Sequence, residues 1–86
     1  MTFPDREQAS VLDQDTQPLP GLTFQLYVAT HHLDLLDIVL AARVRYLTVW
    51  NIAHAIPVRA SHAALVRAGL YRLTGIAYVA PISVLP

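Results

Sequence analysis

The sequence predicts an α+β fold, in which strands and helices share one small core behind an acidic arm. Two observations predict it. Segments in which apolar and polar residues alternate are interspersed with segments in which apolar residues recur every three or four positions, and these are the periods of strands and helices. In addition, 55% of the 86 residues are hydrophobic and only 14% are charged, which is too apolar for a disordered chain. We therefore expect one folded domain over residues 21–86.

Residues 1–20 are expected to form a flexible, disordered acidic arm. They include three prolines, three glutamines and four acidic residues, without hydrophobic periodicity. Pro20 and Gly21 would form the turn that ends the arm. Acidic residues stand where a secretory signal would need an apolar stretch, and charged or histidine residues interrupt every window long enough to span a membrane. We therefore expect a cytoplasmic protein.

Two elements are predicted in the first half of the domain. The first is a strand over residues 22–29, in which apolar and more polar side chains alternate. The second is a helix over residues 31–43, for which Thr30 would be the N-cap. Asp34 and Asp37 lie in the first half of this helix, where negative charge interacts favourably with the helix dipole.

The second half repeats this order with one additional short segment. Residues 44–52 are rich in β-branched and aromatic side chains and are predicted to form a strand with both faces covered. Residues 53–60 are predicted to form a short edge strand or a loop, because they contain Pro57. A helix over residues 61–73 and a last strand over residues 76–84 follow.

Three residues define the second helix further. Ser61 would cap its N-terminus, and Gly75 is well placed to end it. Gly69 lies inside the helix, where glycine costs about 1 kcal/mol relative to alanine. Gly69 therefore indicates a close contact between this helix and another element.

The order of these elements is that of a ferredoxin-like split β-α-β sandwich, in which two helices cover one face of a single sheet. The other sheet face would need a cover. Dimerisation through that face would provide it, which suits a chain whose own core is small. The alternative is a mostly α-helical fold, because residues 33–50 could continue as one helix.

Four segments follow one another in an order that is found in a known regulatory domain. They are the strand at residues 24–28, the helix at 35–40, the strand at 47–52, and the run 70–79 in which a helix end leads into a β-branched strand. Together they resemble the ACT domain, in particular the small regulatory subunits of acetolactate synthase. The resemblance implies a dimer that binds a small-molecule effector in the turn after the first strand. In this chain Thr30, His31 and His32 would be the ligand-binding residues.

Charge is divided sharply along the chain. Residues 1–37 contain all six acidic residues and one arginine, whereas residues 38–86 contain five arginines and no acidic residue. Five arginines without lysine are sparse for a nucleic-acid patch, so nucleic acid is not an expected partner. Instead we expect Arg43, Arg45 and Trp50 to lie at an interface, with the arginines on the rim of an apolar contact surface and the acidic arm as their nearest counter-charge.

No catalytic or metal-binding constellation is recognisable in the sequence. The chain has no cysteine, no glycine-rich phosphate loop and no serine beside a base at a catalytic spacing. His31, His32 and Asp34 are close in sequence, but adjacent side chains on a helix diverge. We therefore expect no catalytic activity, no bound metal and no cofactor.

These observations predict a small non-catalytic regulatory or protein-interaction module. It would dimerise, or dock on a larger protein, through an apolar sheet face, so the expected partner is a protein and most simply a second copy. The alternative is an accessory protein that binds an anionic membrane or lipid through its apolar surface and its arginines.

Overall fold

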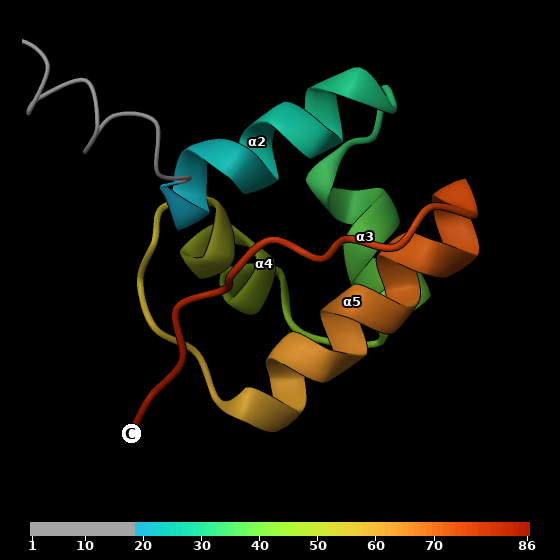
Figure 1. The fold of residues 1–86 in the computed structure, drawn as a ribbon. Coiled ribbons are helices and arrows are strands. Elements are labelled where there is room, and N and C mark those ends of the chain that lie inside the picture. The colour runs from blue at the N-terminus through green and yellow to red at the C-terminus, as the bar shows by residue number, and fades with distance from the viewer. Residues whose placement is uncertain (1–18) are drawn as a thin grey trace, which may run out of the picture.

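The computed structural model describes residues 19–86, and within this range it is built from α-helices (Figure 1). Its helices are α2 (Pro20–Thr30), α3 (Leu35–Ala42), α4 (Tyr46–Ala53) and α5 (Ala60–Thr74). After α5 the chain runs back over the helices in an extended conformation, and it ends on the opposite side of the molecule from the last turn of α5 (Figure 1).

Local sequence signals explain where several helices begin and end. Pro20 occupies the start of α2, where its missing N–H is no loss. At the start of α3, the backbone N–H of Asp34 donates to a carboxylate oxygen of Asp37 at 3.0 Å, one of the two bonds of a capping box. Helix α5 ends at Gly75, which has a left-handed conformation (φ 73°), and its N–H donates to the carbonyl of Tyr71 at 2.7 Å.

Helix α3 is central to the packing. It packs against both α4 and α5, while α2 packs against α4. Helices α3 and α5 approach each other tightly at Gly69, where an added Cβ would lie 2.8 Å from the Cβ of Ala42. The side chains that are completely buried in the core come from all four helices: Phe24, Ile38, Val49, Val66 and Leu70.

The extended C-terminal segment, residues 76–86, closes one side of this core. Tyr78 and Ile82 are buried with the helical residues. The carbonyl of Tyr78 accepts a hydrogen bond from Arg67 at 2.6 Å. Further along, Val58 and Val84 form one isolated parallel bridge. This segment is therefore part of the folded domain although it belongs to no helix.

The predicted ferredoxin-like α+β sandwich is wrong, because residues 19–86 contain helices and one isolated bridge but no sheet. The predicted strand 22–29 lies within α2. Its alternating pattern coincides with a helical one, since Gly21 and Phe24 are buried and Tyr27 and Val28 also pack on the core. The ACT-like and ferredoxin-like descriptions, which depend on a sheet, do not apply to this fold.

The other predicted strands fail for different reasons. Residues 44–52 mostly form α4, whose buried residues Val49, Ile52 and Ala53 recur at helical spacing, so burial overrides the β propensity of the side chains. Of residues 53–60, the first ends α4 and the last begins α5, and residues 54–59 form the loop between the two helices. Residues 76–84 form no strand either, because they lie on the helices and pair with other backbone only at the isolated bridge of Val84 with Val58.

The mostly α-helical alternative agrees with the structure, although no single helix runs over residues 33–50. The break lies at residues 43–45, where Arg43 adopts a left-handed conformation (φ 59°) and ends α3. The predicted helices 31–43 and 61–73 correspond to α3 and α5, and Gly75 ends the second as predicted. Thr30, however, is the last residue of α2 rather than an N-cap.

Only the last two residues of the predicted N-terminal arm, residues 19 and 20, belong to the described part of the chain. Residues 1–18 of the predicted acidic arm lie outside the described residues. Pro20 and Gly21, which were expected to form a turn, are the first two residues of α2.

Candidate functional site

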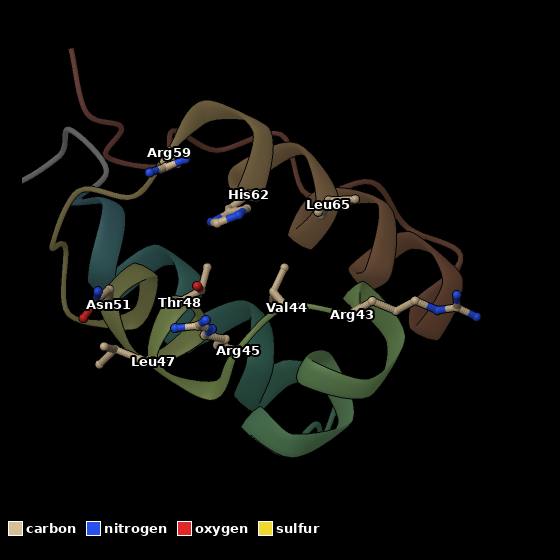
Figure 2. Close-up of a pocket in the computed structure, with 9 residues that line it drawn as sticks. All are labelled: Arg43, Val44, Arg45, Leu47, Thr48, Asn51, Arg59, His62 and Leu65. Atoms are coloured by element: carbon tan, nitrogen blue, oxygen red, sulfur yellow. The ribbon is translucent and has the colours of Figure 1, made fainter.

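A cleft of about 730 Å³ lies between α4 and α5 (Figure 2). The two helices are anchored on other elements, α5 on α3 and α4 on α2 and α3, so their facing sides stand apart. The turn between α3 and α4 and the start of α5 complete the walls. The lining residues are Arg43, Val44, Arg45, Leu47, Thr48, Asn51, Arg59, His62 and Leu65.

Three of the lining residues are arginines, and no carboxylate from the described part of the chain opposes them within the cleft. Arg43, Arg45 and Arg59 are all exposed to solvent. Asp34 and Asp37 are the only acidic side chains in residues 19–86, and neither lines the cleft. Because low-dielectric walls focus the field of such charges, the cleft attracts anions.

Two helix N-termini add to this positive potential. Arg45 and Arg59 are the N-cap residues of α4 and α5, and both have extended backbones. Neither N-cap side chain makes a capping hydrogen bond, so N–H groups of the first turns are left without a side-chain acceptor. The positive ends of both helix dipoles thus lie at the cleft, where they favour negative charge.

Polar side chains from both helices point into the space between the arginines. Figure 2 shows Thr48 directed from α4 towards α5 and His62 in the space between the two helices, with Arg45 beside Thr48 on the side away from His62. Thr48 and His62 are each the third residue of their helix. Arg43 extends away at the far end of the cleft (Figure 2). The cleft therefore offers charged and neutral hydrogen-bond donors along its length.

Helix α4, which forms one wall of the cleft, follows α3 with the connectivity of a helix-turn-helix, two helices joined by a short turn. Helix α3 has 8 residues, α4 has 8 residues, and the three-residue turn Arg43–Arg45 joins them. Such turns often contain glycine because the chain reverses sharply, and here Arg43 takes the left-handed conformation instead. The second helix carries three exposed large side chains, Tyr46, Leu47 and Trp50.

The predicted interface residues are only partly brought together. Arg43 and Arg45 line the cleft, whereas Trp50 does not and instead stacks on His54 with ring centroids 3.9 Å apart. Sequence reasoning missed Arg59 and His62 as partners of Arg45. The signal that could have found them is their position at the start of a helix, since α4 and α5 place their N-terminal turns on the same cleft.

The predicted ligand residues Thr30, His31 and His32 lie at the end of α2, away from this cleft. Thr30 and His31 line a shallower apolar hollow of about 300 Å³ between α2 and the C-terminal segment. The hydroxyl of Tyr27 braces this region, since it donates to the carbonyl of Ile76 at 2.7 Å. His32 is exposed, has a left-handed conformation and does not line the hollow. The three residues thus do not form one site.

Two further findings concern the described part of the chain as a whole. Within residues 19–86, no three histidine or acidic side chains lie close enough together to hold a metal ion. No helix in this range is long and apolar enough to cross a membrane. Comparison with known proteins found no matching family model, no matching curated protein and no matching solved structure.

Proposed function

We propose, against the expectation drawn from the small number of arginines, that residues 19–86 form a non-catalytic DNA-binding module whose cleft between α4 and α5 contacts the phosphodiester backbone of a duplex. The observation that carries this proposal is that three arginines line one cleft, whereas neither acidic side chain of residues 19–86 lines it. A cytoplasmic location, expected from the sequence, is part of the same proposal.

The chemistry of the lining residues suits phosphate. A guanidinium group binds phosphate oxygens through two parallel hydrogen bonds, and helix N-termini bind anions through free N–H groups. Thr48, Asn51 and His62 add neutral donors of the kind that contact phosphates and sugars. Together they support a contact that fixes the orientation of the module on the duplex.

The connectivity of α3, a three-residue turn and α4 supports duplex DNA over other polyanions, because it is the connectivity of the helix-turn-helix. In this motif the second helix enters the major groove and its N-terminal residues meet the base edges. Here the second helix is α4, with Arg45 at its start and Asn51 further along. Arginine and asparagine are the residue types that pair with guanine and adenine in the major groove.

Fluorescence anisotropy with a labelled duplex tests this proposal. We expect a dissociation constant of about 10⁻⁴ to 10⁻⁶ M for non-specific duplex at physiological salt, with the logarithm of affinity falling linearly with the logarithm of salt concentration. If three arginines displace counterions, the slope is about −2 to −3.

Substitutions of arginine test whether the cleft is the part of the protein that contacts the duplex. R45Q/R59Q should weaken binding by about tenfold or more and reduce the magnitude of the slope by about 2, since two charged contacts are lost. R72Q is the matched control, because Arg72 is exposed on α5 but donates to the carbonyl of Ala41 and does not line the cleft. Equal losses in the two variants, or binding that ignores salt, would refute the proposal.

Anionic lipid is the competing ligand, and co-sedimentation with vesicles separates the two. Vesicles with and without phosphatidylserine are compared under the buffer conditions of the duplex experiment. Charge-dependent pelleting without duplex binding would replace the DNA proposal with the membrane alternative. Duplex binding with recovery of the protein in the supernatant supports the proposal made here.

A second candidate function, self-association, is favoured by the outer face of α2. Leu19, Leu22 and Leu26 are 54%, 61% and 66% exposed and are spaced by three and four residues. This spacing is that of a helix-pairing seam. We propose that α2 pairs with α2 of a second copy, which moves the expected dimer interface from a sheet face to a helix face.

Light scattering at micromolar concentration tests the pairing. We expect a dimer for the wild-type chain and a folded monomer for L22E/L26E. The control is L36E, which changes a leucine of similar exposure (59%) on α3. A wild-type chain that is a folded monomer would rule out this second function without bearing on DNA binding.

A further inference from the structure

The charge of the cleft has a counterpart in the same chain. Residues 1–18 contain four of the six acidic residues and only one arginine, Arg6. The domain that follows contains two acidic residues and five arginines, and three of these arginines line the cleft. Because the net charge of the chain is zero, the acidic segment balances most of the cationic surface.

The acidic segment joins the domain at the start of α2. Helix α2 packs on α4, and α4 forms one wall of the cleft. Gly21 in the first turn of α2 packs so closely on α4 that an added Cβ would lie 2.8 Å from the carbonyl oxygen of Ala53. The same oxygen accepts a hydrogen bond from Gln25 at 2.5 Å. Ala53 is the last residue of α4, and the loop after it leads directly to Arg59.

Length is no obstacle to a contact. Eighteen residues can span up to about 60 Å when extended, and a flexible coil of this length has an end-to-end distance of about 2 nm. Tethering also gives the segment an effective concentration in the millimolar range, so weak ion pairs suffice for substantial occupancy.

We propose that the acidic segment of residues 1–18 occupies the arginine-lined cleft when DNA is absent, as an intramolecular competitor for the duplex. Its carboxylates take the positions of phosphates opposite Arg45 and Arg59. This proposal rests on the proposed DNA-binding function. It implies that the apparent affinity for DNA equals the intrinsic affinity multiplied by the fraction of molecules in which the cleft is open.

Neutralising the segment in the full chain tests the competition. If the cleft is occupied in about nine of ten molecules, D5N/E7Q/D13N/D15N raises the affinity for duplex about tenfold. R6Q makes the segment more acidic and should lower the affinity. Both effects are measured by anisotropy at low ionic strength, where ion pairs are least screened.

A double-mutant cycle separates occupancy of the cleft from general repulsion between the acidic segment and DNA. In the R45Q/R59Q background the fourfold neutralisation should give little or no gain, because the segment has lost its site. An equal gain in both backgrounds would mean that the acidic residues only repel DNA at a distance, and it would overturn the proposal.

NMR spectroscopy without DNA tests the intramolecular contact independently of the DNA-binding function. In NMR spectra without DNA, the amide resonances of Arg59 and His62 should shift between the wild-type chain and the neutralised variant, whereas those of Leu22 should not. Shifted cleft resonances in a chain that never binds duplex would support the intramolecular contact and refute the DNA-binding function. Unchanged cleft resonances would refute the contact, whatever the chain does with DNA.

Discussion

Arg43 has two roles, of which lining an anion-binding cleft favours arginine and ending a helix in a left-handed conformation favours glycine. It lines the cleft, and it ends α3 in a left-handed conformation with φ 59° and ψ 45°. That conformation costs a residue with a Cβ about 1–2 kcal/mol, whereas glycine adopts it freely. A charged residue at this turn is therefore understandable if its guanidinium group contributes to binding.

Replacement of Arg43 should improve stability and weaken binding. R43G should raise the free energy of unfolding by about 0.5–1 kcal/mol, since relief of strain exceeds the entropy that glycine adds to the unfolded chain. It should also lower the affinity for duplex. Urea denaturation and anisotropy measure the two effects. The control R43A keeps the strain and removes the charge, so an equal stabilisation by R43A would contradict the argument.

Tyr78 is a buried residue with an unsatisfied group. Its ring packs edge-on against Phe24 and Tyr27, with centroids 5.7 Å and 5.1 Å away. Among residues 19–86 its hydroxyl oxygen has no hydrogen-bond partner. Burial raises the pKa of this phenol above its ordinary value of 10.0, and the nearby Arg67 partly offsets the rise.

Stability should therefore fall in alkaline solution through Tyr78. Because the folded-state pKa is raised, the unfolded chain loses this proton first, so the contribution is complete below pH 10.0 and is lost as pH rises above it. Y78F should be about as stable as the wild type near neutral pH, or up to about 1 kcal/mol more stable, because a buried unpaired hydroxyl is removed. Urea denaturation across this pH range checks both points. If the stability of Y78F falls with rising pH as much as that of the wild type, a group other than Tyr78 causes the loss.

Among the elements, α3 and α5 could be predicted from the sequence and α2 and α4 could not. The first two carry strong local signals, namely the acidic start at Asp34 and Asp37 and the glycine end at Gly75. Residues 22–29 and 44–52 contain β-branched and aromatic side chains that favour strands locally. Their helical state is decided by burial against other elements, which a single sequence does not specify.

Contact between α3 and α5 should be sensitive to a single methyl group at Gly69. Alanine usually stabilises a helix interior by about 1 kcal/mol relative to glycine. At this position, however, the new Cβ would lie 2.8 Å from both the Cβ and the backbone nitrogen of Ala42. We expect G69A to destabilise the fold by about 1–3 kcal/mol, because the two helices must move apart. Urea denaturation measures this effect.

A second substitution checks the cause. A42G removes one of the clashing atoms, so G69A/A42G should be more stable than the sum of the single changes predicts. The recovery should be partial, because the backbone of Ala42 stays close to the new Cβ. Additive effects of the two changes would mean that the clash does not limit the packing of α3 on α5.

At the scale of the whole molecule, the sequence revealed that the domain has an excess of positive charge, but it did not reveal where in the fold the arginines lie. The absence of acidic residues after Asp37 indicated a surface with one sign of charge. The convergence of Arg43, Arg45 and Arg59 depends on how α4 and α5 are held apart, which follows from their separate contacts with α2 and α3. Arginines that are dispersed along the sequence thus line one cleft in the fold.

The most direct test of the account is an NMR titration of the isotope-labelled full chain with a duplex, followed residue by residue. We predict shifts that cluster on Arg45, Thr48, Asn51, Arg59 and His62, that diminish as salt rises, and that are lost in R45Q/R59Q. Shifts concentrated on the exposed leucines of α2, or no shifts at low salt, would contradict the central claim that the cleft between α4 and α5 binds DNA.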